Sequence, residues 1–407
     1  MKLLSKSLLS TVTLLAVAGQ LSIASAAPLP PPFNDYGVDL TLNGGVREEY
    51  NSNVLSAPGG PTKVEDYITT FNPGLTLEWG KNALTDVTFN YTETFLRYAN
   101  RPTLNDELSN LGLNISRKQG PFTLTGTAAF VQNYSNSPSA IGGATNLAGI
   151  IRSDVLSAGG DVHYDMSEKF NADVGFNWAR TSYLYAIGKA YQNSDSYSVP
   201  ASIFYVYSPE ISVGLGYTYS QTDQKNSINP YSVGRERDSN TFSINTVLTK
   251  WQKLTGTANA GVTINNIQGV NAPAGQVQSG LTTTTGSYGL GLEYDYSEKV
   301  AFTLNGTRNF TVGVSGQNIQ NTGAGLGLNY NYSDSISLQA NLITLNYSQY
   351  LQTPRDDLSK STGITLSWKP FDYLTFSTGY TYFMNSSNAP AATYNINDVF
   401  VSAMIHY

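Results

Sequence analysis

The chain of 407 residues contains no cysteine and only two histidines. Without cysteine it cannot form a disulfide scaffold, a thiolate metal site or a cysteine nucleophile. Two histidines also leave little room for a transition-metal site made of protein ligands. We therefore expect no metal, no cofactor and no catalytic residue, so the sequence does not indicate an enzyme.

Charged residues are scarce as well, at 13% of the chain, against roughly 25% in an ordinary soluble domain. The net charge is −6, and no basic cluster is present, which excludes a basic nucleic-acid binder. The chain has 28 Tyr and 37 Gly. Aromatic richness argues against disorder, and Gly, Asn, Thr and Tyr are weak helix formers.

Long apolar runs are missing, and the longest one lies at the N-terminus. Lys2 and Lys6 precede an apolar stretch at 8–18, and small residues follow at 24–26. This pattern predicts a secretory signal peptide at 1–26, too short to span a bilayer as a helix. Its removal takes away two lysines and changes the net charge from −6 to −8. We expect a short periplasmic segment at 27–35 and one domain at 36–407.

The rest of the chain repeats a pattern of short turns between alternating runs. In 211–219, for example, Ile211, Val213 and Leu215 lie on one face and serines and glycines on the other. Such alternation predicts a β-strand with one apolar face. The turns are at 80–82, 118–121, 166–169, 208–210, 251–253, 297–299, 333–335 and 369–372.

Longer polar segments separate the resulting hairpins, including 136–150 and 267–282. About 18 strands result, joined by eight turns and nine loops. Short turns at one end and long loops at the other indicate an all-β fold, a transmembrane antiparallel β-barrel with short periplasmic turns and longer extracellular loops. The expected location is the outer membrane of a Gram-negative-type bacterium, and outer-membrane lipid is an expected partner.

The apolar face is expected to point outward, because the opposite face carries Gly, Ser, Thr and Asn with few charges. That composition suits a wet lumen better than the surface of a soluble sandwich or solenoid, which is the main alternative fold. Aromatic residues recur beside the turns and indicate an interfacial girdle. They are Trp79, Tyr164, Tyr205, Tyr207, Tyr294, Tyr296, Tyr330, Tyr332 and Trp368.

The last run, 399–407, alternates apolar residues and ends on an aromatic one. Val401, Ile405 and Tyr407 share one face. This run resembles the C-terminal signal by which the barrel-assembly machinery recognises outer-membrane proteins. Phe is the more usual last residue of that signal, and Tyr407 departs from it.

The opening hairpin, with Glu49-Tyr50-Asn51-Ser52-Asn53 followed by 66–75, resembles the outer-membrane family called β-barrel porin 2. The resemblance covers about 36–80. Barrels of that family are implicated in exopolysaccharide export, so the resemblance implies a polysaccharide conduit as an alternative to a channel for passive passage of small hydrophilic solutes. By alternation Tyr373 and Phe383 would face inward and could stack on sugar rings.

Charged residues divide between the two ends of the predicted barrel. Acids expected on the lumen face near the periplasmic mouth predict weak cation selectivity, because confined carboxylates concentrate cations. They are Glu78, Asp161, Asp165, Asp173, Glu293 and Asp295. Arginines are expected towards the outer rim, where they could bind lipopolysaccharide phosphates. They include Arg97, Arg152, Arg180, Arg235, Arg237 and Arg308.

An outer-membrane enzyme would need a histidine paired with serine or aspartate. His163 falls between Asp161 and Asp165 on the polar face. We interpret it as an imidazole that lines the lumen. His406 has no acid near it in the sequence.

Overall fold

The computed structural model describes residues 37–58, 63–81, 83–135, 151–184, 193–225, 236–268, 281–312, 318–351, 354–389 and 392–407. The predicted signal peptide at 1–26 and the segment at 27–35 lie outside these residues. No helix in the described part of the chain is long and apolar enough to cross a membrane.

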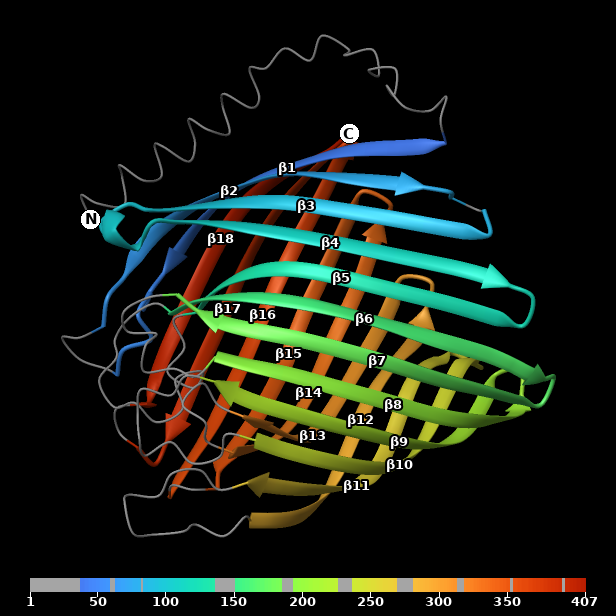
Figure 1. The fold of residues 1–407 in the computed structure, drawn as a ribbon. Helices are drawn as coiled ribbons and strands as arrows, with labels where there is room; N and C mark the ends of the chain where they lie inside the picture. The colour runs from blue at the N-terminus through green and yellow to red at the C-terminus, as the bar shows by residue number, and fades with distance from the viewer. Residues whose placement is uncertain are drawn as a thin grey trace.

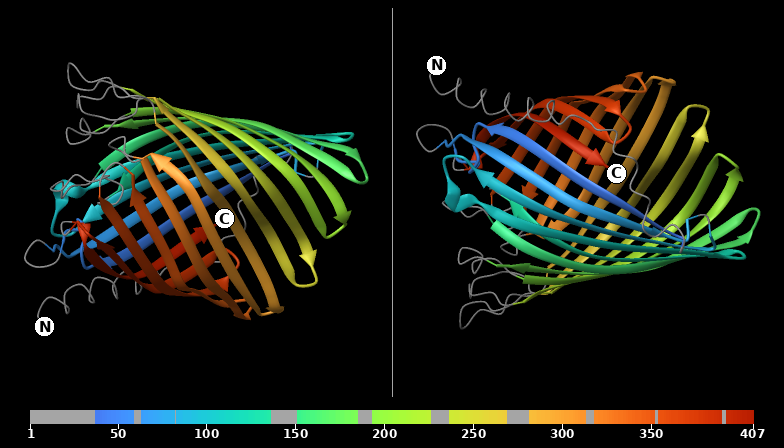
Figure 2. Two further views of the ribbon diagram at one scale, coloured as in Figure 1. Left: turned by 90° about the horizontal axis from the view of Figure 1, so that it is seen from below. Right: turned by 90° about the horizontal axis from the view of Figure 1, so that it is seen from above.

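Eighteen antiparallel strands form one sheet that closes on itself (Figure 1). Each strand pairs with its neighbours in sequence, and β1 also pairs with β18. Figure 2 shows the closed barrel from two opposite directions. The strands are β1 (Val38–Asn51), β2 (Asp66–Trp79), β3 (Thr85–Tyr98), β4 (Asp106–Gln119), β5 (Phe122–Ser135), β6 (Ile151–Ser167), β7 (Phe170–Tyr183), β8 (Asn193–Ser208), β9 (Ile211–Lys225), β10 (Glu236–Trp251), β11 (Leu254–Gln268), β12 (Leu281–Ser297), β13 (Val300–Val312), β14 (Asn318–Ser333), β15 (Ile336–Tyr350), β16 (Arg355–Phe371), β17 (Leu374–Ser387) and β18 (Tyr394–His406).

Short turns join the strands at one end of the barrel, beginning with 80–84 between β2 and β3 and 120–121 between β4 and β5. Gly80 has a φ of +77°, and a Cβ there would lie 2.1 Å from the Thr85 carbonyl oxygen, so only glycine fits. The longer connections are all at the opposite end, where one contains the 3₁₀ turn η2 (Pro102–Leu104). The prediction of about 18 strands, with turns at one end and loops at the other, is confirmed.

The apolar face points outward, as the alternation predicts. Leu215, Ile244 and Trp79 are among the large apolar side chains left 54–65% exposed. In an aqueous fold this exposure would be unfavourable, since each Å² of apolar surface costs about 25 cal/mol in water. A barrel without edges pairs all its backbone groups, which makes the same face compatible with lipid.

The aromatic residues predicted beside the turns lie on this outer face, near the short-turn end. Tyr207, Tyr296 and Tyr332 are the most exposed of the tyrosines there, at 59–69%. Phe122 and Tyr164 stack across β5 and β6, with ring centroids 4.6 Å apart. An aromatic girdle at the membrane interface has this arrangement.

The last strand closes the barrel. Leu42 donates its backbone N–H to Tyr407 O at 2.7 Å, and Tyr407 N–H donates to Leu42 O at 2.9 Å. Ile405 lies opposite Gly44 and packs closely over it: a Cβ added to Gly44 would be only 3.3 Å from Ile405 Cγ1. Val401, Ile405 and Tyr407 therefore face the membrane together, and the C-terminus and the start of β1 lie at the short-turn end.

Candidate functional site: the barrel interior

The inner face of the barrel is built from small, neutral, hydrogen-bonding side chains. This follows from the alternation, because each apolar residue that faces lipid turns its neighbours inward. Two hollows in the wall show the pattern. One, of about 300 Å³, is lined by Thr127, Ser157, Asn177, Ser196, Ser198, Ser220 and Thr222, among others. The second, of about 260 Å³, is lined by Thr303, Asn305, Asn329, Gln339, Asn341 and Thr344, among others.

Hydrogen bonds between these side chains run across strands and orient the polar lining. Asn43 Nδ2 donates to Thr76 Oγ1 at 3.3 Å, and Thr76 donates on to Asn90 Oδ1 at 2.9 Å. On the other side, the hydroxyls of Thr241 and Thr263 are 2.9 Å apart. Between its two charged ends the lumen therefore offers neutral donors and acceptors.

Acids gather on the inner face at the short-turn end. Glu78 lies opposite Asp39 of β1, and Asp161 lies opposite Gly175 of β7. Glu293 and Asp295 face the lumen between Leu292, Tyr294 and Tyr296, which face out. The acids predicted for this mouth share the inner face, and their effect on permeation stays a prediction.

Some of these acids have cationic neighbours. Lys81 Nζ is 3.2 Å from Glu78 Oε2, and this hydrogen bond raises the pKa of Lys81 above its ordinary value. Among the described residues no ion pair involves Glu293, Asp295 or Asp161. Those three acids are therefore the best candidates for an uncompensated negative field.

His163 lies on the inner face between two carboxylates. Its Nδ1 is 2.6 Å from Asp173 Oδ1, and its Nε2 is 3.1 Å from Asp165 Oδ1. Asp161 and Asp165 are close to His163 in the sequence. Asp173 lies on β7, and it is seen to be a partner only once β6 and β7 are paired. Both ring nitrogens are thus engaged by carboxylates.

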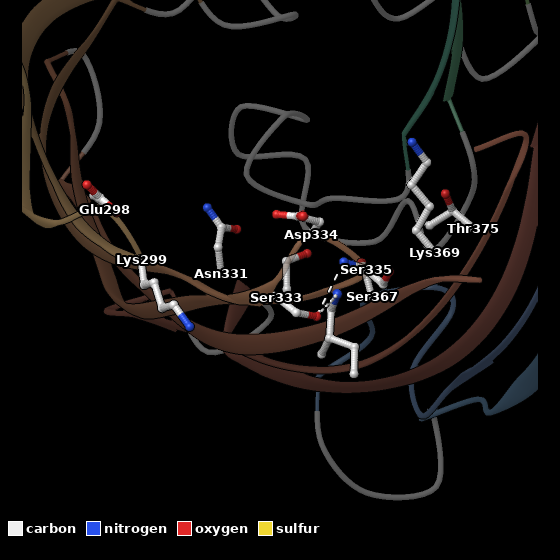
Figure 3. Close-up of a pocket in the computed structure, with 11 residues that line it drawn as sticks. Glu298, Lys299, Asn331, Ser333, Asp334, Ser335, Ser367, Lys369 and Thr375 are labelled. Atoms are coloured by element: carbon white, nitrogen blue, oxygen red, sulfur yellow. Dashed lines mark hydrogen bonds between the residues drawn. The ribbon is translucent and has the colours of Figure 1, made fainter. Parts of the chain in front are cut away.

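The turns at this end also enclose a hollow of about 670 Å³ between β12 and β17 (Figure 3). Its lining includes Glu298 and Asp334 and the two lysines Lys299 and Lys369. Ser333 Oγ accepts hydrogen bonds from the N–H groups of Ser335 and Ile336, at 3.3 and 3.2 Å. Charges of both signs thus surround the periplasmic mouth.

Ion pairs mark the opposite, long-loop end of the interior. Arg355 and Asp357 form a bidentate pair at 2.9 and 2.6 Å, with side chains only 8% and 2% exposed. Arg47 bonds Glu49 at 2.7 Å and lies 3.9 Å above the ring of Phe400. Each pair joins residues two apart on one strand, which therefore share the inner face, and neither pair was singled out from the sequence.

The segment after β1 folds over this end and is well packed. Val54 is fully buried and clusters with Ile68 and Tyr98. Asn53 is also fully buried, and its amide donates to the backbone oxygens of Ala57 and Asn395 at 2.9 and 3.2 Å. This segment fixes one side of the extracellular mouth. Loops 136–150 and 269–280 lie outside the described residues.

The arginines predicted for the outer rim take different positions. Arg97 and Arg180 face outward and bond Glu107 and Asp195, at 2.5 and 2.7 Å. Arg308 also lies on the outer face, opposite Thr322. These three arginines lie on the outer face, and binding of lipopolysaccharide stays a prediction.

Arg152 shares the outer face of β6 with Asp154 and Leu156. Arg152 reaches Asp106 at 2.7 Å, and both side chains are mostly buried. Arg237 alternates onto the inner face, where it donates to Asn265 Oδ1 at 3.2 and 2.8 Å. Arg235 lies outside the described residues.

Inward aromatic residues are few. Phe383 faces the lumen and packs against Tyr394 with ring centroids 5.7 Å apart. Tyr373, expected to face inward, lies in the turn after β16 and stacks on Phe371 at 5.4 Å. Phe400 also faces inward, beneath Arg47.

A closed barrel with an apolar outer band and a polar interior defines the class of transmembrane β-barrels. The fold is similar to that of OpdK from Pseudomonas aeruginosa, solved with vanillate, at 9% sequence identity and a TM-score of 0.50. The match covers 91% of this chain and 99% of that one. OccAB3 from Acinetobacter baumannii matches at 9% identity and a TM-score of 0.48, over 91% and 99% of the two chains.

No protein-family model matches this sequence, and no curated protein matches it either. The resemblance of the first hairpin to β-barrel porin 2 therefore stays a prediction. What the structural comparison shows is the fold.

Proposed function

We propose that the protein is an outer-membrane channel that allows passive passage of small hydrophilic solutes. The observation that carries the proposal is the neutral polar lining of the lumen, described above, inside a wall whose outer face is apolar. With strands about 4.8 Å apart and tilted near 40°, an 18-stranded barrel has a backbone diameter of about 35 Å. Inward side chains do not fill a barrel of this width, because barrels of 16–18 strands leave an aqueous channel.

The polar lining suits uncharged or weakly charged solutes. Threonine, serine and asparagine supply both donors and acceptors, so a solute that loses its water shell finds replacement partners along the wall. The inward aromatic residues are scattered and do not form a continuous stacking track. Phe383, Tyr394, Tyr98 and Tyr350 lie towards the extracellular end, Phe400 is near the middle of β18, and Phe204 is near the short turn after β8. This distribution favours a channel for small solutes over a polysaccharide conduit.

Conductance of the purified barrel in planar bilayers tests the proposal. We expect stepwise, long-lived openings and faster swelling of loaded liposomes in small sugars than in large ones. A barrel that never conducts would contradict the proposal. A second variant deletes 52–58, the well-packed segment over the extracellular mouth. Its conductance should be higher than that of the wild type, because this segment narrows the pore.

A further inference from the structure

A hydrogen-bonded row of polar side chains runs across the outer face of four strands. Ser109 of β4 donates to Glu93 Oε2 of β3 at 2.6 Å, and Tyr91 O–H donates to the same oxygen at 2.9 Å. Gln132 of β5 accepts from the Ser109 N–H at 2.9 Å and donates to Asp154 Oδ1 of β6 at 3.1 Å. We call Glu93, Ser109, Gln132 and Asp154 the outer polar ladder.

The ladder lies on the wall that faces lipid. Glu93 alternates with Tyr91 and Phe95 on β3, and Phe95 stacks on the exposed Phe71 with ring centroids 6.1 Å apart. The carboxylate thus has outward-facing aromatic residues on both sides along its own strand. Charged groups on the lipid face of a barrel destabilise it in a depth-dependent way, and ionisable residues within a membrane usually have a partner.

The ladder supplies no positive charge. Among the described residues no Lys, Arg or His forms an ion pair with Glu93 or Asp154. The hydroxyl and amide donors satisfy some of the carboxylate oxygens. Arg152, the next outward residue to Asp154 on β6, is paired with Asp106 instead, so neither carboxylate has a cationic partner among the described residues. A partner with a cation would neutralise them.

One outward row away from the ladder, beyond Phe130 and Leu156, the wall is flat. Gly126 pairs with Gly160, and Ala128 pairs with Ala158, so four outward positions in a row on β5 and β6 carry almost no side chain. A Cβ added at Gly126 would meet nothing within 4 Å. Small residues allow close approach of a neighbouring protein surface within a membrane, so the ladder and this patch together form a face suited to protein contact.

The same chain carries a matching cation on another wall. Lys360 of β16 faces outward between its cross-strand neighbours Leu345 and Met384, and it is exposed. No salt bridge involves it among the described residues. Lys360 lies 11 residues from the short-turn end of β16 at Phe371, and Glu93 lies 8 residues from that of β3 at Thr85. The difference, roughly 8 Å along a tilted strand, is within reach of a flexible lysine arm.

Lys360 and Glu93 cannot meet within one barrel. Five steps around the sheet separate β16 from β3, about 100° of the circumference. In two neighbouring copies the two faces can meet, and such a head-to-tail contact closes into a ring when the rotation allows.

We propose that this protein forms a homo-oligomer in the membrane, in which the outer polar ladder of one copy packs against the Lys360 face of the next. Opposite charges at the contact fix its register and reject other neighbours. The occupant of the ladder face is a second copy of this chain. The proposal does not depend on the proposed channel function.

Cysteine cross-linking tests the contact directly, because the natural sequence has no cysteine. In native membranes under mild oxidation, the variant with Glu93→Cys and Lys360→Cys should form disulfide-linked dimers and higher species. The control combines Lys360→Cys with Leu215→Cys, an outward position on β9, and should stay monomeric. Equal cross-linking of both pairs, or none in the first, would overturn the proposal.

Charge reversal gives an independent measurement. In native gel electrophoresis of the extracted protein, Glu93→Lys alone and Lys360→Glu alone should each shift the population to monomers, and the two changes together should restore the oligomer. A wild-type protein that is entirely monomeric in lipid nanodiscs refutes the proposal, as does a double variant that stays monomeric. If Glu93→Lys fails to insert, the cysteine pair still decides the question.

Discussion

The buried pair of Arg355 and Asp357 provides a quantitative test of how tightly the extracellular end of the lumen is packed. The change Asp357→Asn keeps the shape of the side chain but removes the charge that faces the guanidinium. Arg355 then keeps its contact with the Tyr350 ring, 4.5 Å from the guanidinium carbon, and one amide oxygen as an acceptor, but it has no counter-charge. With both side chains less than a tenth exposed, loss of one partner should cost about 3–5 kcal/mol in the free energy of unfolding, the usual range for an uncompensated buried charge.

Urea unfolding from lipid vesicles, followed by the fluorescence of the four tryptophans, measures this cost under conditions where refolding is reversible. The midpoint should fall while the slope with urea stays unchanged. The change Asp372→Asn is the control, because Asp372 pairs with Lys369 at 3.2 Å but is fully exposed. Exposed pairs contribute little, so this variant should match the wild type.

A further variant separates burial of charge from loss of packing. Replacing both partners, as Arg355→Met with Asp357→Leu, should recover most of the lost stability, because neither charge remains to be desolvated. If Asp357→Asn unfolds at the wild-type urea concentration, the pair is hydrated and the reasoning fails.

Three other predictions concern topology, assembly and selectivity. Labels attached within 136–150 should react in intact cells, whereas a label at Glu298 should react only after the outer membrane is opened; labelling of both would break the assigned strand order. Tyr407→Asp should lower the yield of heat-modifiable barrel, because it places a charge where the last strand meets lipid, and a normal yield would argue against a role for the C-terminus in assembly. Reversal potentials in a KCl gradient should show weak cation selectivity that fades at about 1 M salt, where the Debye length is about 3 Å; anion preference, or no effect of Glu293→Gln with Asp295→Asn, would contradict it.

The strand pattern could be predicted from the sequence because lipid imposes a general rule. Most outward positions between the girdles are apolar, so Ile211, Val213 and Leu215 reveal both a strand and its orientation. The short turns and their spacing then determine the strand count. Topology follows without knowledge of any contact between strands.

The groups that depend on register could not be predicted in this way. The link between His163 and Asp173 joins neighbouring strands, and of the two acids nearest to His163 in sequence only Asp165 bonds it, whereas Asp161 does not. Glu93 breaks the apolar rule altogether, and its partner Ser109 becomes visible only once β3 and β4 are aligned.

The hydrogen bonds between Leu42 and Tyr407 have a consequence for how the chain could be rewired. Val38, at the start of β1, is four residues from Leu42, about 13 Å along the strand. A linker of about five residues could therefore join position 407 to position 38 at the short-turn end. A chain joined in this way and cut between Glu298 and Lys299 would begin with β13 and end with β12. The native seam between β1 and β18 would then become an ordinary hairpin, and a different pair of strands would have to meet last to complete the cylinder.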